Sequence, residues 1–80
     1  MPTMLRLKNI KIENGTAEAD FFPENSNTAG HIVVDIQSET IRSCERVDGF
    51  GESYEGHAKL HLLRMAKQNI TDKERVVMWY

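Results

Sequence analysis

The sequence contains a single cysteine, Cys44, so no disulfide bond can form within the chain. This excludes the small secreted folds that several disulfide bonds hold together. Long apolar runs are also missing, since stretches such as Ile32-Val33-Val34 are far shorter than a membrane-spanning helix or the core of a signal peptide. We therefore expect a soluble, cytoplasmic protein without a membrane partner.

An excess of basic residues is missing as well, because ten lysines and arginines are outnumbered by twelve aspartates and glutamates. Proteins that bind nucleic acid usually carry a net positive charge, so a nucleic-acid partner is not expected. The basic residues are nevertheless concentrated in residues 1–15 and 57–80. They could form one basic patch if the two ends meet in space, although acidic neighbours from the middle of the chain more often neutralise such residues.

Motifs for metals and cofactors are incomplete. The segment Gly49-Phe50-Gly51 lacks the third glycine of a dinucleotide-binding loop, because Tyr54 occupies that position. His57 and His61 have the spacing of two zinc ligands on a helix, but Ala58 stands where a zinc protease has its glutamate. The sequence therefore predicts neither a metal nor a cofactor.

The composition itself is that of a globular protein, with 40% hydrophobic and 28% charged residues. A chain of 80 residues forms one domain, which we expect to span residues 1–80. The core of so small a domain leaves little room for a deep cavity. We therefore expect any functional site in a surface groove or between subunits.

The pair Asn14-Gly15, between two alternating apolar runs, is the strongest hairpin signal in the chain. A type I′ turn needs a positive φ at both central residues, and asparagine and glycine tolerate it best. A two-residue turn here places Ile10 and Ile12 on one face of the sheet. In this register Leu5, Leu7 and Phe22 fall on the opposite, charged face. Either a bulge near Lys8-Asn9 corrects this, or the second face is partly covered.

Two further strands are predicted over residues 31–37 and 41–47, where apolar and polar residues alternate. A tight turn at Ser38-Glu39 would join them. This register places Asp35 opposite Arg42. The side chains on their side of the two strands form an outer face, which points away from the core. The outer face would gather His31, Val33, Asp35, Arg42, Cys44 and Arg46.

The outer face is a candidate ligand site, although a ladder of cross-strand salt bridges is the more usual role of such residues. The predicted register pairs Val33 with Cys44 and makes His31 and Cys44 diagonal neighbours. A Cys–His pair can supply a thiolate nucleophile, but a lone cysteine on a strand usually behaves as a small apolar residue.

A helix is predicted over residues 54–68, with Ser53 as its N-cap and Asn69 near its C-terminal end. Its apolar stripe comprises Tyr54, Ala58, Leu62, Met65 and Ala66. Leu60 and Leu63 point away from the centre of this stripe, which makes them candidates for a homodimer interface. The alternative is that the stripe is misplaced and Leu63 faces the sheet.

The last strand is predicted over residues 74–80, where Val76, Met78 and Tyr80 alternate with Val77 and Trp79. Because both of its sides are apolar, we expect it in the middle of the sheet. The predicted order is thus ββββαβ: an α+β domain in which one helix packs on one face of a largely antiparallel sheet of about five strands.

The function class that these features favour is a small binding or interaction module without catalytic activity of its own, with a protein partner or a second copy of itself. One alternative is a small enzyme or ligand-binding protein with its site in the Gly49–His57 loop, where Phe50 could be either a lid or a binding anchor. Another is an accessory protein that binds nucleic acid through the basic ends. The candidate ligand-binding residues are Phe50, Ser53, His57, His31, Arg42 and Arg46.

Overall fold

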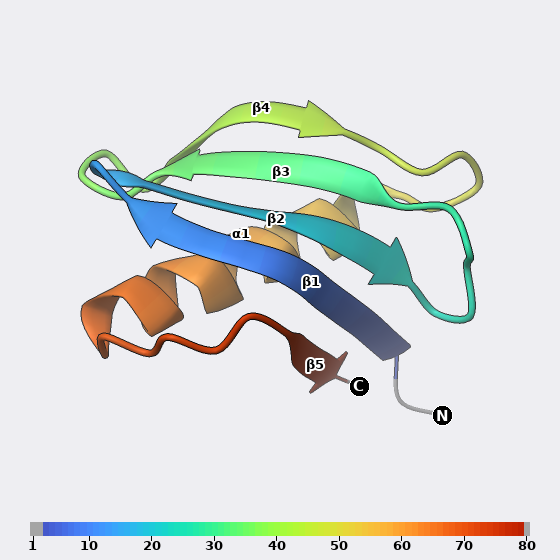
Figure 1. The fold of residues 1–80 in the computed structure, drawn as a ribbon. Coiled ribbons are helices and arrows are strands. Elements are labelled where there is room, and N and C mark those ends of the chain that lie inside the picture. The colour runs from blue at the N-terminus through green and yellow to red at the C-terminus, as the bar shows by residue number, and fades with distance from the viewer. Residues whose placement is uncertain (1–2, 80) are drawn as a thin grey trace.

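One antiparallel sheet and one helix make up the structure, a computed structural model that describes residues 3–79 without the side chains of Glu52 and Trp79. The elements are β1 (Thr3–Glu13), β2 (Thr16–Pro23), β3 (Gly30–Asp35), β4 (Thr40–Glu45), α1 (Glu52–Lys67) and β5 (Arg75–Trp79). The strands lie in the order β4-β3-β2-β1-β5 (Figure 1). The predicted α+β class and the ββββαβ order are confirmed.

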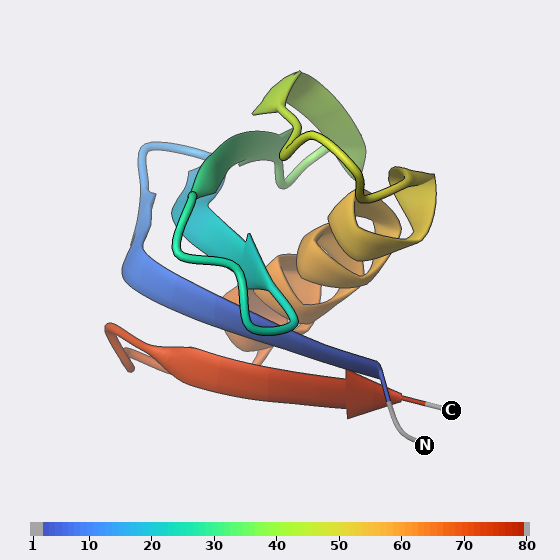
Figure 2. The same ribbon diagram turned by 90° about the vertical axis from the view of Figure 1, so that its right-hand side faces the viewer.

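The sheet curves around α1, which covers one of its faces (Figure 2). Side chains alternate between the two faces of a strand, and β2 shows this most clearly because every second residue is buried. The buried residues on the helix-facing side include Leu5, Leu7, Phe21, Ile32, Val34, Leu62, Met65 and Val77. No element of residues 3–79 covers the opposite side of the sheet, which we call the open face.

The β1–β2 hairpin forms as predicted. Asn14 and Gly15 make the turn, with φ values of 52° and 80°. The register is shifted between Lys8 and Lys11, where two residues of β1 lie opposite one residue of β2. This is the expected bulge, and it turns the leucines at the start of β1 to the helix-facing side, where they are fully buried.

The connection between β3 and β4 is longer than predicted. Residues 36–39 form the turn, and the carboxylate of Asp35 accepts a hydrogen bond from the backbone N–H of Ser38 at 3.0 Å. Asp35 consequently pairs with Thr40, and the predicted pairing of Asp35 with Arg42 is wrong. Because the Asp35 side chain binds the backbone of the turn, Ile36 and Gln37 belong to the turn and not to the predicted ladder.

The remainder of β4 is shifted by one residue from the predicted register. Arg42 is an extra residue in the ladder with β3, and Cys44 lies opposite Ile32 instead of Val33. A shift of one residue moves every side chain to the other face. Cys44 therefore packs against the core on the helix-facing side, and the predicted neighbours His31 and Cys44 lie on opposite faces of the sheet.

Helix α1 begins one residue before Ser53, and its N-cap is Gly51, which makes no side-chain capping bond. The predicted N-cap role of Ser53 is wrong, because the extended backbone at Gly51 already starts the helix there. The C-terminal end is as predicted, since Asn69 has a φ of 55°. The N–H of Ile70 donates to the carbonyl of Met65 at 3.0 Å, the geometry of a Schellman motif.

Leu63 belongs to the core, with only 6% of its side chain exposed, whereas Leu60 is 47% exposed. Leu63 therefore faces the sheet, as in the alternative to the predicted stripe, and a homodimer interface that includes the two leucines stays a prediction. A curved sheet contacts a wider arc of the helix than a flat one, so the buried stripe extends further than helical spacing alone indicated.

Strand β5 lies at an edge of the sheet, beside β1, and the prediction of a central position is wrong. Val77 is buried beneath the sheet, while Val76 and Met78 are 58% and 63% exposed on the open face. Although both sides of this strand are apolar, only the side that carries Val77 is buried. Tyr80 and the side chain of Trp79 lie outside the described part of the chain.

Candidate functional site

The open face carries a patch in which apolar and cationic side chains of β1, β2 and β5 lie side by side. We call it the β1–β5 patch, and it consists of Met4, Arg6, Lys8, Phe22, Val76 and Met78. Val76 lies opposite Arg6 and Met78 opposite Met4 in the ladder between β1 and β5. Arg6 in turn lies opposite Phe22 on β2, so the patch is continuous across the three strands.

The cations of this patch are held in place by an aromatic ring. The guanidinium carbon of Arg6 lies 5.2 Å from the centroid of the Phe22 ring, and Nζ of Lys8 lies 5.6 Å from it. Arg6 Nη2 also donates a hydrogen bond to the carbonyl oxygen of Ser26 at 2.7 Å. Contacts of this kind stabilise a cation by roughly 0.5–1 kcal/mol at exposed sites, and they also reduce its freedom to move.

The two basic ends of the chain do meet, because β1 and β5 are neighbours. Their cations are divided between the faces, since Arg75 lies opposite the buried Leu7 while Arg6 and Lys8 are on the open face. Acidic residues of β2 also lie beside the basic strand, as in the pair of Lys8 with Asp20. The open face is thus cationic along β1 and acidic along β2, rather than uniformly basic.

His31 forms the centre of a charged cluster on the acidic part of the open face. Its Nδ1 lies 2.8 Å from Oδ1 of Asp20, and its Nε2 lies 3.1 Å from Oε2 of Glu18. Asn9 donates to the other carboxylate oxygen of Asp20 at 2.8 Å. The hydrogen bond to Asp20 is the main reason that the pKa of His31 is raised above 6.5, and the pKa of Asp20 is correspondingly lowered.

This arrangement limits what His31 can do chemically. An imidazolium that donates to two carboxylates has no lone pair left to accept a proton or bind a metal. His31 and Asp35 share the open face, as predicted. Arg46, however, forms an ion pair with Glu55 of α1 through bonds of 3.0 and 2.9 Å, so the predicted cluster that included Arg46 does not form.

Arg42, the remaining predicted member of that cluster, is exposed at the bulge of β4. The pKa of Asp35 is lowered chiefly by the hydrogen bond from the Ser38 N–H, and Arg42 contributes through its charge. Arg42 is therefore an electrostatic neighbour of Asp35.

The predicted loop of residues 49–57 extends only to Gly51, because residues 52–57 belong to α1. In this segment, which we still call the Gly49–His57 loop, Phe50 packs on the start of α1. Its ring lies 5.2 Å from that of Tyr54 at an angle of 86°, an edge-to-face contact. Tyr54 Oη donates to Oε1 of Glu24 at 2.9 Å, which fixes the second ring as well. Ser53 is exposed and His57 half-buried. These contacts favour the interpretation of Phe50 as a lid over the helix end.

Cys44 is not suited to be a nucleophile. Burial, followed by its hydrogen bond to Glu55, raises the pKa of the Cys44 thiol to about 12. At neutral pH such a thiol is protonated, whereas the thiolate is the reactive species. The structure therefore contradicts the idea of a Cys–His pair on two grounds, namely the opposite faces and the protonation state.

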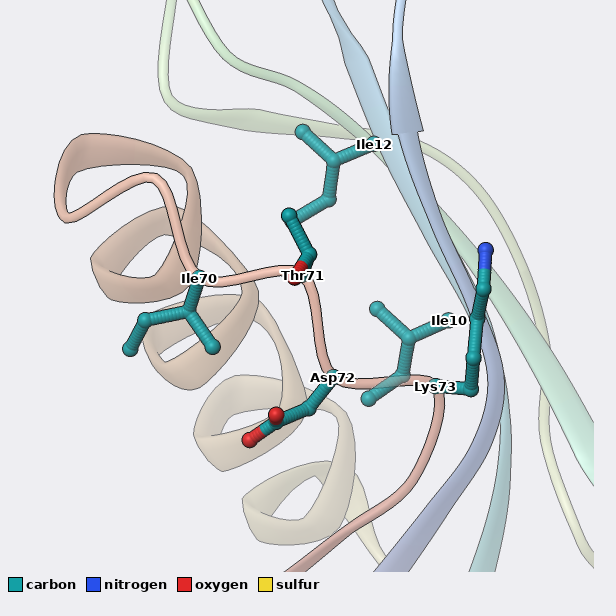
Figure 3. A pocket seen from close by; sticks show the side chains of 6 residues that line it. All are labelled: Ile10, Ile12, Ile70, Thr71, Asp72 and Lys73. Atoms are coloured by element: carbon teal, nitrogen blue, oxygen red, sulfur yellow. The ribbon is translucent and has the colours of Figure 1, made fainter.

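We describe three shallow hollows on the surface of residues 3–79, and none of these three is lined by the Gly49–His57 loop. One of about 110 Å³ lies between β1 and the segment after α1, where Ile10 and Ile12 face residues 70–73 (Figure 3). A second, of about 160 Å³, adjoins it at Ile12 and Ile70. These volumes are below the roughly 300 Å³ at which ligand pockets usually begin.

The third hollow, of about 210 Å³, brings the two predicted interface leucines together. Leu60 and Leu63 line it, with Arg64 and Lys67 of α1 and Glu39 of the β3–β4 turn around them. Lys67 Nζ lies 3.4 Å from Oε1 of Glu39, an exposed ion pair that contributes little to stability. The groove is apolar in the middle and charged at its border.

Within residues 3–79, no group of three or more histidine, cysteine, aspartate or glutamate side chains could hold a metal ion. The prediction that the protein binds no metal stays a prediction. No helix of the described chain has the length and apolar character needed to cross a lipid bilayer. The sequence matches no protein-family model, and neither a curated protein nor a solved structure matches the chain.

Sequence reasoning missed the β1–β5 patch. Val76 and Met78 were assigned to a buried strand, and Arg6 and Phe22 were not considered together. The pairing of β1 with β5 joins residues about 70 positions apart in the sequence, and no local pattern specifies it. The one available signal was the alternation in β5, which sets Val76 and Met78 apart from Val77.

Proposed function

We propose that the protein is a cytoplasmic binding module without catalytic activity of its own. Its contact surface is the β1–β5 patch, and its partner is a protein segment that carries both acidic and apolar side chains. The lone cysteine, which cannot form a disulfide within the chain, supports a reducing compartment.

The observation that carries this proposal is the exposure of Val76 and Met78 beside ordered cations. Exposed apolar side chains that form a contiguous group, rather than single ones, mark interaction sites. Methionine, arginine and aromatic residues are the types enriched at protein interfaces. Because Phe22 and Ser26 already hold Arg6, a partner carboxylate would meet a cation that loses little freedom on binding.

A catalytic role has less support. Both ring nitrogens of His31 are engaged by carboxylates, and the thiol of Cys44 is protonated at neutral pH. The Gly49–His57 loop packs its aromatic residue against α1, and the hollows of the surface are shallow. An enzyme would need a convergent set of available groups in a concave site.

The test is selection of peptides from a random library displayed on phage, with the wild-type protein as target. We expect the selected peptides to combine aspartate or glutamate with leucine, isoleucine or phenylalanine. Their binding should be lost in a Val76→Asp, Met78→Asp variant, which places two negative charges in the patch. Leu60→Asp is the matched control, because it alters an exposed apolar residue on the helix side. Peptides that bind this control and the patch variant equally well would disprove the proposal.

A nucleic-acid partner is the second candidate, favoured by the meeting of the two basic ends at β1 and β5. Its test is the fluorescence anisotropy of a labelled single-stranded oligonucleotide as a function of salt. Binding that weakens steeply with salt and disappears in the patch variant would replace the proposed protein partner by a nucleic acid. We expect no such binding, because a nucleic acid needs a run of cations along its phosphates, whereas the open face is cationic along β1 and acidic along β2.

A further inference from the structure

The outer side of β5 presents backbone groups that no strand of residues 3–79 pairs with. The carbonyl of Met4 accepts a hydrogen bond from Glu24 on the β2 side of β1. Backbone groups alternate in direction along an antiparallel strand, so those of Leu5 point toward β5. Val77, which lies opposite Leu5, bonds back to β1, and the N–H and C=O groups of Val76 and Met78 point outward.

Among the described residues, β5 has little that blunts this edge, since its one charged side chain, Arg75, lies at its first position. Natural sheets protect an edge strand with a bulge, a proline or charged side chains. The ladder between β1 and β5 runs without a register shift from Thr3–Trp79 to Leu7–Arg75, so β5 has no bulge. Its open-face side chains, Val76 and Met78, are apolar and exposed.

We propose that β5 is a self-association surface, on which a second copy of this chain adds its own β5 in antiparallel orientation around Val77. One sheet then runs through both copies. This surface is the backbone edge of the sheet, and it shares the side chains of Val76 and Met78 with the β1–β5 patch, whose other members lie on β1 and β2.

The occupant is a second copy because the strand is complementary to itself. A two-fold axis at Val77 places Val76 of one copy opposite Met78 of the other, and Met78 opposite Val76. Each of these two pairs joins outward-pointing backbone groups and buries part of two exposed apolar side chains against each other. A two-fold axis one residue further toward the N-terminus would instead pair Glu74 with Met78, which lacks this complementarity.

The experiment compares sedimentation of the wild type with that of Met78→Pro. Proline removes the outward N–H of residue 78, and an edge strand tolerates it where that N–H bonds to no other strand. We expect the wild type to be dimeric at roughly 100 µM, and the dimer Kd to rise by roughly tenfold or more in the variant. Met78→Val is the matched control, since it keeps the N–H and an apolar side chain, and it should remain dimeric.

A second variant covers the case in which Met78→Pro fails to fold. Val76→Lys with Met78→Lys changes only exposed side chains, and it places lysine opposite lysine in the proposed pairing. It should be a folded monomer, while Ser43→Lys with Glu45→Lys on the other edge should remain a dimer. A wild type that is monomeric at that concentration, or a dimer that survives the lysines on β5, overturns the proposal.

Discussion

The two edges of the sheet, β4 and β5, differ in how far they can accept another strand. In β4 the extra residue Arg42 interrupts the ladder, and the segment that follows is tied to α1 by the two hydrogen bonds between Arg46 and Glu55. In β5 the ladder is regular, and the exposed side chains are those of Val76 and Met78. One edge is therefore distorted and charged, and the other is regular and, apart from Arg75 at its start, apolar.

This difference teaches that an edge position alone does not decide whether a strand is closed. A bulge twists the edge and leaves a backbone group out of register, and a charge on the edge must be desolvated before another strand can pair. Both features occur on β4. Since an unprotected apolar edge favours association, the character of β5 is the reason for our proposal that a second copy pairs there.

The largest effect is expected from a charge placed on the buried side of β5. Val77→Asp should destabilise the protein by about 3 kcal/mol or more, because the carboxylate would lie unpaired in the core. Val76→Asp, one residue away on the open face, should change the stability by no more than about 0.5 kcal/mol. Urea unfolding followed by circular dichroism measures both. Equal losses would show that β5 is not oriented as described.

The next effect concerns the packing of β3 against β4. A Cβ at Gly30 would overlap the carbonyl oxygen of Glu45 and the ring of Phe21. Gly30→Ala should therefore cost about 1–3 kcal/mol through overpacking. Gly56→Ala is the control, because it has open space on the helix surface and should raise the stability by roughly 0.5–1 kcal/mol. Thermal unfolding of the two variants should shift in opposite directions, and a stable Gly30→Ala would contradict the close approach of β4.

A smaller loss is expected when the tie between the β4 side and the helix is removed. Arg46→Ala should destabilise the protein by at most about 1 kcal/mol, since the arginine is half exposed and solvent screens the pair. The loss should shrink at high salt. Urea unfolding at low and high salt checks this, with Lys67→Ala as a control for a more exposed pair. A salt-independent loss of several kcal/mol would assign Arg46 a packing role instead.

The smallest effect concerns the charged cluster in the middle of the sheet. The pKa of His31 should lie above 6.5 because of its hydrogen bond to Asp20, and that of His61 below 6.5 because of burial. A raised pKa in the folded state means that the stabilisation is fully present below pH 6.5 and is lost as the pH rises through the folded value. NMR titration of the imidazole ring protons shows which of the two histidines has the higher pKa. Asp20→Asn should lower the pKa of His31. A pKa of His31 below that of His61 would contradict the hydrogen bonds described for the cluster.

Local signals in the sequence specified the elements and several of their ends. Asn14-Gly15 fixed the first hairpin, because few residue pairs tolerate a positive φ twice in succession. The need to bury Leu5 and Leu7 indicated the bulge in β1. Asn69 marked the end of α1, again through its left-handed conformation. These features depend on residues close together in the chain.

The features that were not predicted either lack a unique local pattern or depend on distant parts of the chain. The register of β4 follows from the hydrogen bond between Asp35 and Ser38 and from the bulge at Arg42, and neither has a unique sequence pattern. The burial of Leu63 requires knowledge of the curvature of the sheet. The position of β5, and with it the candidate site, depends on a pairing between the two ends of the chain.

The comparison of the two edges is tested most directly by hydrogen exchange of single backbone amides at two protein concentrations. The N–H groups of Val76 and Met78 point outward from β5, and by the same alternation that of Cys44 points outward from β4. We predict that the amides of Val76 and Met78 exchange quickly in dilute protein and become protected in concentrated protein, while that of Cys44 exchanges at the same rate in both. Protection of Val76 and Met78 that does not change with concentration, or that changes equally for Cys44, would contradict an edge of β5 that is open to a second copy.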